Sequence, residues 1–386
     1  MIGAMVAYIS LAYNLYLLAH NIKIQTKLIK RLKNKDLFWG AYYETYVAAA
    51  FIKAGFDLEF ENEDDNSRTH CEFTATCRKT GSKYYVEAKS RQAGKGHAII
   101  SNQLCAALMK EANHKRVVFI DVNVSDNADR VENIKWWRES LESLRHKEGT
   151  LMIKGKPAPE AYIFVTNHPY HYNLDSTRYG WSGLVEGFKI PDFKVDTEYS
   201  NIRDALRSRK KHADMEQLIK SIKEHYEIPS TFDGEIPVFA FNENISRLRI
   251  GQRYVISSND GTEVVGELTT ACVLEPDKMV YGAYKLMDGR SIIATSPLTD
   301  EEFSAYKRHP DTFFGVYMKQ GKEAKSPLEL FVFFFESYRN TPKERLLELM
   351  KEFPDHERLK NESQEELAII YCERMVYSAM SKHKGD

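Results

Sequence analysis

Cysteine is scarce in this chain and follows no metal-binding or disulfide pattern. The 386 residues contain five cysteines, and no two of them form a CxxC pair: Cys71, Cys77, Cys105, Cys272 and Cys372. Their odd number and irregular spacing fit neither a zinc site nor a disulfide framework. We therefore expect a protein of a reducing compartment, most simply the cytoplasm.

Net charge is also nearly absent, at −1 from 54 basic and 55 acidic residues. A nucleic-acid ligand would then have to be bound by local basic patches and metal ions, because the chain has no global positive field. There is no internal repeat, no low-complexity tract and no GxxxxGK[ST] motif of an ATPase or helicase. The length exceeds that of one ordinary core, so two or three domains are expected.

Residues 1–19 carry no charge at all, and a run of basic residues follows at 23–35. The length is close to the roughly 20 apolar residues that a membrane span needs, and the basic flank would suit an anchor. Ser10, Asn14 and several tyrosines argue against a span, and the basic start of a signal peptide is missing. We predict a buried or partner-packed helix, with a membrane anchor as the alternative.

Helix and strand patterns alternate through the first half of the chain. The stretch 37–54 is typical of a helix that ends at Gly55, since glycine is common just after a helix. Further helices are predicted near 98–113 and 128–146, and strands at 56–61, 70–77, 83–89, 116–124 and 161–167. The KTGS turn indicates an antiparallel hairpin, whereas the later helices indicate parallel crossovers. The expected fold is α/β, with helices on both faces of a mixed sheet.

The second half of the chain has a different pattern. Residues 168–200 are predicted to be irregular, and 202–227 to form a basic amphipathic helix. Short strands separated by NDG and DGR turns then predict a small antiparallel barrel or sandwich, and helices return near 326–382. The expected segments are an N-terminal helical segment at 1–36, an α/β domain at 37–200, a basic helical linker at 201–235, a small antiparallel β domain at 236–325 and C-terminal helices at 326–386.

Glu87 and Lys89 are the first residues that indicate chemistry. They lie two positions apart in the strand KYYVEAK, so both side chains project from one face. A charged pair in an otherwise apolar strand needs partners, which a divalent metal ion with bound water would supply. Glu72 belongs to the neighbouring strand of the hairpin, where cross-strand carboxylates could share one hard cation such as Mg²⁺.

Glu44 adds a carboxylate from the first helix of this region. It is the only charged residue between positions 36 and 53, and aromatic and alanine residues surround it. A lone carboxylate in such a helix requires a cation or a hydrogen-bond donor. The sequence therefore predicts that Glu44, Glu72, Glu87 and Lys89 converge.

An acid on the first helix, an acid on the second strand and ExK on the third strand resemble the PD-(D/E)XK (restriction-endonuclease-like) nucleases, over residues 37–167. The resemblance implies hydrolysis of phosphodiester bonds with Mg²⁺ or Mn²⁺ held by Glu72 and Glu87. It makes Glu44 a further ligand or a base outside the ligand set. It also implies that Lys89 orients the attacking water or helps to deprotonate it. The family's second acid is usually Asp, so Asp64 and Asp65 are alternative ligands to Glu72.

Several other side chains are weaker candidates. Arg91, Lys95 and Gln103 follow the ExK strand and are predicted to contact nucleic acid, although an ordinary charged loop and a solvent-facing helix are equally consistent. His168 and His171 could form a metal pair, or could be ordinary histidines without a third ligand. The basic residues of 203–211 could follow a nucleic-acid backbone or form a solvated helix face. The Phe331–Phe335 run indicates a core or an oligomer interface.

The predicted function is that of a metal-dependent nuclease, with DNA as the expected substrate and the C-terminal region recruiting substrate, partner or a second copy of the chain. The alternative is a non-catalytic nucleic-acid-binding or scaffold protein that keeps the fold, a hypothesis prompted by the Glu72 departure. A membrane-tethered interaction protein is a third hypothesis. Roles in restriction, phage defence, recombination and repair all remain open, because fold alone does not define a substrate.

Overall fold

The computed structural model describes residues 3–60, 72–90, 100–122, 130–168, 182–194, 199, 201–232, 236, 248–257, 262–288, 290–318 and 327–382. The chain divides into two compact units. The first comprises Met1–Ile190 and Asp214–Gln320, and the second comprises Pro191–Ala213 and Gly321–Asp386.

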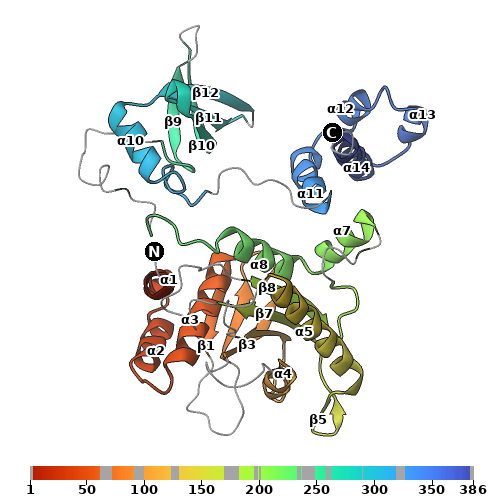
Figure 1. The fold of residues 1–386 in the computed structure, drawn as a ribbon. Coiled ribbons are helices and arrows are strands. Elements are labelled where there is room, and N and C mark those ends of the chain that lie inside the picture. Colours follow the sequence, from red (N-terminus) through yellow and green to blue (C-terminus); the bar gives the residue numbers. More distant parts are fainter. Residues whose placement is uncertain are drawn as a thin grey trace. The chain divides into compact units, whose positions relative to one another are not determined.

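A six-stranded mixed sheet forms the centre of the first unit (Figure 1). Its strands, in spatial order, are β1 (Phe56–Phe60), β2 (Phe73–Cys77), β3 (Lys83–Ser90), β4 (Lys115–Asp121), β7 (Ala161–Asn167) and β8 (Ser182–Phe188). The pairs β1–β2, β2–β3 and β7–β8 are antiparallel, whereas β3–β4 and β4–β7 are parallel. The predicted α/β class, the mixed sheet and the β2–β3 hairpin are confirmed.

Strand β8 was not predicted, because it falls within residues 168–200, which the sequence indicated to be irregular. That prediction is wrong for 182–188, where all seven residues pair with β7. Gly183 and Gly187 explain the failure. Glycine weakens a strand pattern, and β8 forms because the neighbouring strand supplies its hydrogen-bonding partners.

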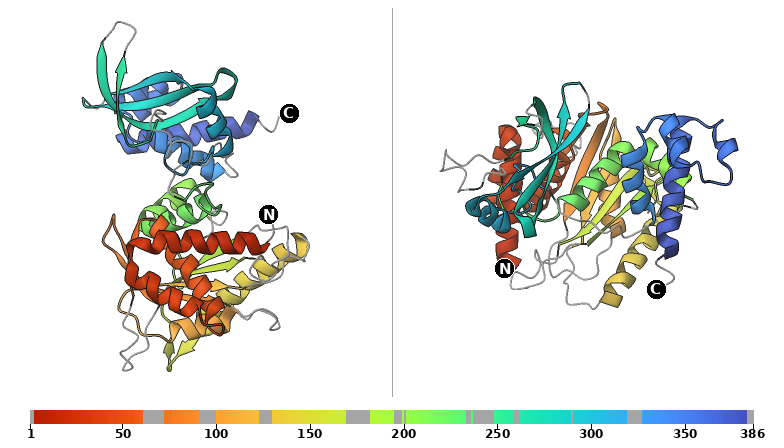
Figure 2. Two further views of the ribbon diagram at one scale, coloured as in Figure 1. Left: turned by 90° about the vertical axis from the view of Figure 1, so that its left-hand side faces the viewer. Right: turned by 90° about the horizontal axis from the view of Figure 1, so that it is seen from above.

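Helices cover both faces of this sheet. Helix α3 (Phe38–Lys53) packs on one face, where the Phe51 ring lies 5.1–5.9 Å from the rings of Phe56, Phe73 and Phe119. Helices α4 (Ile100–Leu108) and α5 (Arg130–Thr150) cover the other face, on which Val118 and Ile120 project. Figure 2 shows strands of the sheet between the red N-terminal helices and α5. Helix α3 ends before Gly55, whose φ of 83° suits the residue after a helix.

The N-terminal residues form α1 (Gly3–Leu17), the short 3-10 helix η1 (Leu18–His20) and α2 (Ile22–Leu32). Helix α1 packs against α3, where the Tyr42 hydroxyl donates a hydrogen bond of 2.7 Å to the Ala7 carbonyl. Helix α2 buries Ile24 and Leu28 on its apolar side. Among the helices described here, none is both long and apolar enough to span a membrane.

The predicted basic helix over 202–227 is two helices, so that prediction is wrong in detail. Helix α7 (Ile202–Lys211) ends where His212 leaves the helical conformation, and α8 (Ala213–Glu224) follows. Helix α7 belongs to the second unit, whereas α8 belongs to the first. There, Asp214 of α8 accepts hydrogen bonds of 2.8 Å from the hydroxyls of Tyr84 and Thr80.

Short antiparallel strands follow, as the turn signals predicted. Strands β9 (Arg253–Ser257), β10 (Glu263–Leu274), β11 (Met279–Leu286) and β12 (Ser291–Pro297) form a curled sheet in the order β12-β11-β10-β9. The helix η3 (Glu275–Asp277) joins β10 to β11, and α10 (Asp300–Arg308) begins with a capping box of Thr299 and Glu302. A small hairpin of β5 (Met152–Ile153) and β6 (Lys156–Pro157) follows α5.

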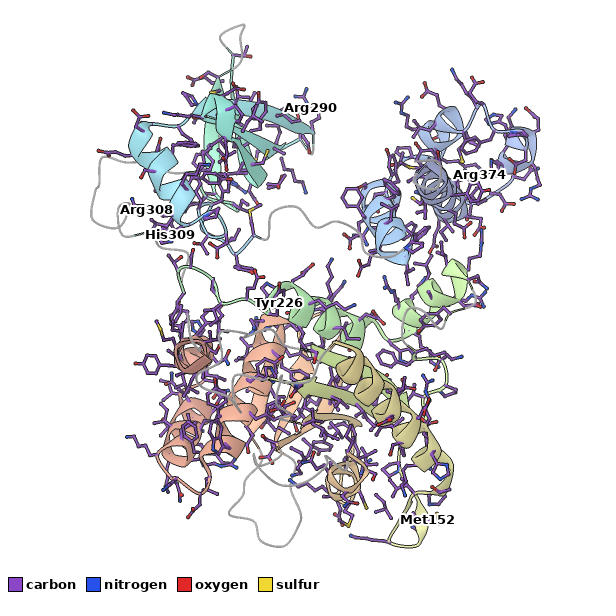
Figure 3. The ribbon with its side chains drawn as sticks, in the orientation of Figure 1. Met152, Tyr226, Arg290, Arg308, His309 and Arg374 are labelled. Atoms are coloured by element: carbon purple, nitrogen blue, oxygen red, sulfur yellow. The ribbon has the colours of Figure 1, made fainter. Side chains whose placement is uncertain are left out.

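The second unit is helical. It contains α7, α11 (Pro327–Tyr338), α12 (Lys343–Leu349), α13 (His356–Leu359) and α14 (Gln364–Lys382). Phe331 is fully buried beside Cys372, whereas Phe333 is 64% exposed, so the phenylalanine run is only partly core. Arg374, which is labelled in Figure 3, belongs to α14. It holds both carboxylate oxygens of Asp355, at 2.8 and 2.7 Å.

Replacing Phe51 with alanine should lower the free energy of unfolding by about 3–5 kcal/mol, because loss of the ring would leave a cavity between α3 and three strands. Tyr8→Ala is the control, since Tyr8 is 75% exposed, and it should change stability by no more than about 0.5 kcal/mol. Urea unfolding followed by circular dichroism measures both. Equal losses in the two variants would contradict the packing described for α3.

Candidate functional site

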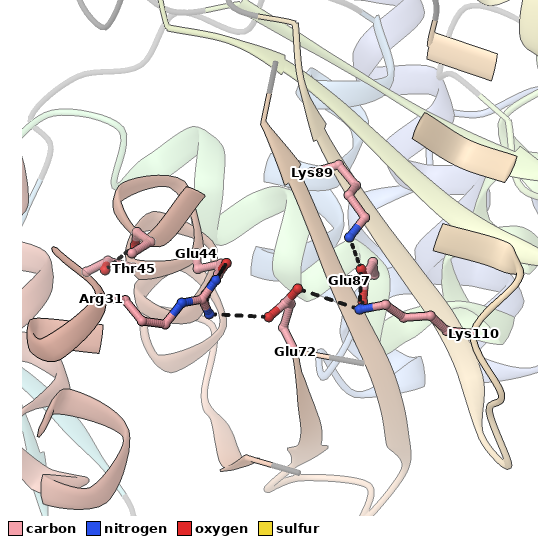
Figure 4. Close-up of polar contacts among 8 residues, drawn as sticks. Arg31, Glu44, Thr45, Glu72, Glu87, Lys89 and Lys110 are labelled. Carbon is pink, nitrogen blue, oxygen red and sulfur yellow. Dashed lines mark hydrogen bonds and ion pairs between the residues drawn. The ribbon is translucent and has the colours of Figure 1, made fainter. Parts of the chain in front are cut away.

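The β2–β3 hairpin places two of the predicted acids opposite one another. Glu72 directly precedes β2, and its backbone N–H donates a hydrogen bond of 3.0 Å to the Val86 carbonyl. Phe73 pairs with Val86, so the same register places Glu72 across from Glu87. Glu87 and Lys89 project from one face of β3, as the period of a strand requires. The structure therefore brings Glu72, Glu87 and Lys89 together (Figure 4).

Two lysines neutralise Glu87. Lys89 forms an ion pair with Glu87 Oε1. The ammonium of Lys110, just after α4, lies 2.7 Å from Oε1 and 2.8 Å from Oε2 of Glu87. The same Lys110 Nζ is 3.7 Å from Glu72 Oε1. Lys110 thus lies between Glu72 and Glu87, two of the three carboxylates that were predicted to be metal ligands.

Arg31 of α2 neutralises the third acid. Its guanidinium binds both oxygens of Glu44, with Nη2 at 2.7 Å from Oε1 and Nη1 paired with Oε2. Nη1 also lies 3.6 Å from Glu72 Oε2. One continuous chain of ion pairs results, running through Glu44, Arg31, Glu72, Lys110, Glu87 and Lys89 (Figure 4).

The sequence did not single out Arg31 or Lys110 as site residues. Arg31 was noticed only as part of the basic run after the uncharged N-terminus. The helical pattern of α2 was an available signal for Arg31, because that residue lies seven positions after Ile24 and three after Leu28, on the side of α2 that those two residues bury. No comparable signal marks Lys110, because lysines are common near the carboxyl ends of helices, where they interact favourably with the helix dipole.

Burial makes ionisation of two of the acids costly. Glu44 and Glu87 are each 3% exposed. Burial raises the pKa of Glu44 to about 8; the charge of Glu72 adds to the shift, and Arg31 opposes it. Burial and the charge of Glu72 also raise the pKa of Glu87, against the opposing effect of Lys89 and Lys110. The site therefore favours protons or cations beside its carboxylates.

The donor chemistry fits a hard divalent cation. Mg²⁺ and Mn²⁺ are bound through carboxylate oxygens and water, and Glu72 and Glu87 already share one cationic group, Lys110. Within the described ranges, however, no three acidic, histidine or cysteine side chains form a group that could hold a metal ion. The cations of Arg31 and Lys110 stand between the carboxylates.

The remaining candidates from the sequence were proposed as contacts for nucleic acid or as alternative metal ligands. Arg91, Lys95, Asp64, Asp65 and His171 lie outside the described residues. Gln103 is a partly buried residue of α4.

His168 is buried at the end of β7 in a second polar cluster. Its Nδ1 is 3.2 Å from Asp121 Oδ1, and its ring centroid is 4.5 Å from that of Tyr46. Thr166 bridges the hydroxyl of Tyr43 and Asp121, at 2.8 and 3.2 Å. These contacts give His168 partners within the protein.

No protein-family model matches the chain, and comparisons with curated proteins and with solved structures found no match either.

In metal-free buffer, the free energy of unfolding of Glu44→Gln should fall less than that of the wild type as the pH rises from about 5 to 8. The pKa of Glu44 is about 8 in the folded protein and 4.5 ordinarily. The folded state therefore binds the proton more tightly, and this stabilisation, complete below the ordinary pKa, is lost as the pH rises through 8. Glutamine does not titrate.

Urea unfolding at a series of pH values in EDTA measures these slopes. Glu160→Gln, at an exposed position, is the matched control and should retain the wild-type slope. A wild-type slope in Glu44→Gln would contradict the raised pKa.

Proposed function

We propose that this chain is a metal-dependent nuclease that hydrolyses phosphodiester bonds, with DNA as the expected substrate. The observation that carries the proposal is the pairing of Glu87 and Lys89 on one face of β3 with Glu72 across the hairpin. Glu72 and Glu87 would hold Mg²⁺ or Mn²⁺, and Glu44 would be a further ligand or a base beside them. Lys89 would orient the attacking water.

The position of the site in the sheet supports this proposal. Strands β3, β4 and β7 are parallel, and Lys89 lies next to the last residue of β3. Ligand sites of open α/β sheets gather at the carboxyl ends of such strands. The four residues named from the sequence are joined there by one chain of ion pairs, which is the convergence that the proposal requires.

Several groups at the site would each contribute a different part of the chemistry. A bound divalent cation supplies Lewis acidity and a more acidic water. The Lys89 ammonium, already held by Glu87, supplies a positive charge and a hydrogen-bond donor close to the carboxylates. With its pKa raised to about 8, Glu44 is suited to exchange a proton near neutral pH. Arg91, Lys95 and Gln103 remain proposed contacts for the nucleic-acid backbone.

A second candidate function is a non-catalytic nucleic-acid-binding or scaffold protein that keeps the α/β core. One observation favours it: three cations already pair with the three acids, so the network can persist without metal. Buried ion networks of this kind can be purely structural. Binding of nucleic acid without metal-dependent turnover would support this candidate over the nuclease.

Purified protein should cleave at least one of linear duplex DNA, circular duplex DNA, single-stranded DNA and RNA with Mg²⁺ or Mn²⁺, and none with EDTA. Lys89→Ala and Glu87→Gln should each lower the cleavage rate by about 100-fold or more, because each removes a group next to the reacting phosphate. Gel assays of initial rates measure the effect.

The control is Lys83→Ala, at the exposed opposite end of the same strand, which should cleave at the wild-type rate. Circular dichroism confirms that each variant is folded. Metal-dependent cleavage that survives in both site variants would refute the assigned residues.

A further inference from the structure

Lys110 occupies the place in the site where a shared cation is expected. Its ammonium lies 2.7 and 2.8 Å from the two oxygens of Glu87 and 3.7 Å from an oxygen of Glu72. Neither of the other two cations has this position, because Lys89 pairs with Glu87 and Arg31 pairs with Glu44 and Glu72. Lys110 is therefore the only one of the three that joins the two acids of the hairpin.

A divalent cation and the Lys110 ammonium would compete for the same oxygens. Glu87 is 3% exposed and also pairs with Lys89, so its oxygens have little access to water. Two cations held a few ångströms apart repel each other strongly in such a partly dry site. Metal binding to Glu72 and Glu87 consequently requires the Lys110 ammonium to withdraw.

The local structure permits this withdrawal. Lys110 lies beyond the last residue of α4, and its side chain is 26% exposed, which leaves a route to solvent. Its backbone is held separately, because Arg116 Nη2 donates a hydrogen bond of 3.1 Å to the Lys110 carbonyl. The side chain can thus leave Glu87 while the turn that carries it stays in place.

We propose that Lys110 is an internal counter-ion of the metal-free site that competes with the metal ion and so sets its affinity. The inference rests on the proposed function, because it takes Glu72 and Glu87 as metal ligands. It assigns a role to a residue outside the four predicted ones. It also implies that the protein binds its metal more weakly than its carboxylates alone would allow.

Direct titration with Mn²⁺ tests the proposal without any nuclease assay. Free Mn²⁺ is followed by electron paramagnetic resonance at neutral pH, for the wild type, Lys110→Met, Lys115→Met and Glu87→Gln. Lys110→Met should bind Mn²⁺ about five- to tenfold more tightly, the size expected when a competing, partly exposed ion pair of about 1 kcal/mol is removed. Lys115 is exposed at the start of β4, so Lys115→Met should bind as the wild type does.

Glu87→Gln separates failure of this inference from failure of the metal site. It should weaken Mn²⁺ binding about tenfold or more, because one carboxylate ligand is lost. If Glu87→Gln weakens binding while Lys110→Met binds as the wild type does or less tightly, the competition is overturned and the metal site stands. If Glu87→Gln binds Mn²⁺ like the wild type, the metal site and the inference both fail.

Folding is checked by the melting temperature of each metal-free variant. Lys110→Gln, which keeps a polar side chain, serves as a second substitution and should also bind Mn²⁺ more tightly. Addition of Mn²⁺ should raise the melting temperature of both Lys110 variants more than that of the wild type, because tighter binding to the folded state gives greater stabilisation. An equal or smaller rise in both would count against the proposal.

Discussion

Repulsion among three carboxylates in one partly dry site is the constraint on which the arrangement of this site depends. Glu44 and Glu87 are almost fully buried, so water can solvate neither of them well. The protein compensates with Arg31, Lys89 and Lys110, which makes the six groups neutral when all are ionised. Each of these long side chains loses rotational freedom when it is held there, and the gain in ion pairing is reduced accordingly. A ligand of the site therefore has to interact with these side chains more favourably than they interact with one another.

Two features of the fold hold the carboxylates close enough to interact. The hairpin register sets Glu72 opposite Glu87, and a shift by one residue would send one of them to the other face of the sheet. Helix α3 carries Glu44, and it approaches the sheet through buried alanines at 48–50 and through Phe51. The site thus depends on the same packing that forms the core of the first unit.

Local patterns predicted those features well, because the KTGS turn indicated the hairpin and Gly55 marked the end of α3. The pairing of Glu87 with Lys89 followed from their spacing alone. Arg31 and Lys110 were missed because their partners are 13 and 23 residues away, and only the packing of α2 and α4 brings them to the site. Strand β8 was missed for a related reason: its glycines give no strand signal, and β7 provides the pairing. The sequence thus predicts a helix or strand more readily than the residues that contact it in the folded protein.

Under the proposed function, the charge balance of the site would link metal binding to the binding of an anionic substrate. When all six side chains are ionised and no metal is bound, three carboxylates face three cationic side chains, and an added phosphodiester would leave one negative charge in excess. With a divalent cation bound and Lys110 displaced but still nearby, five positive charges would face four negative ones once the phosphate is present. A metal alone would leave two positive charges in excess and a phosphate alone one negative charge, whereas the two together leave one positive charge because their charges partly cancel. Because unbalanced charge is costly in a partly buried site, each ligand should favour the other, and this coupling is reciprocal. A protein of this design would hold its metal weakly until the substrate arrives, with Lys110 filling the site in the meantime.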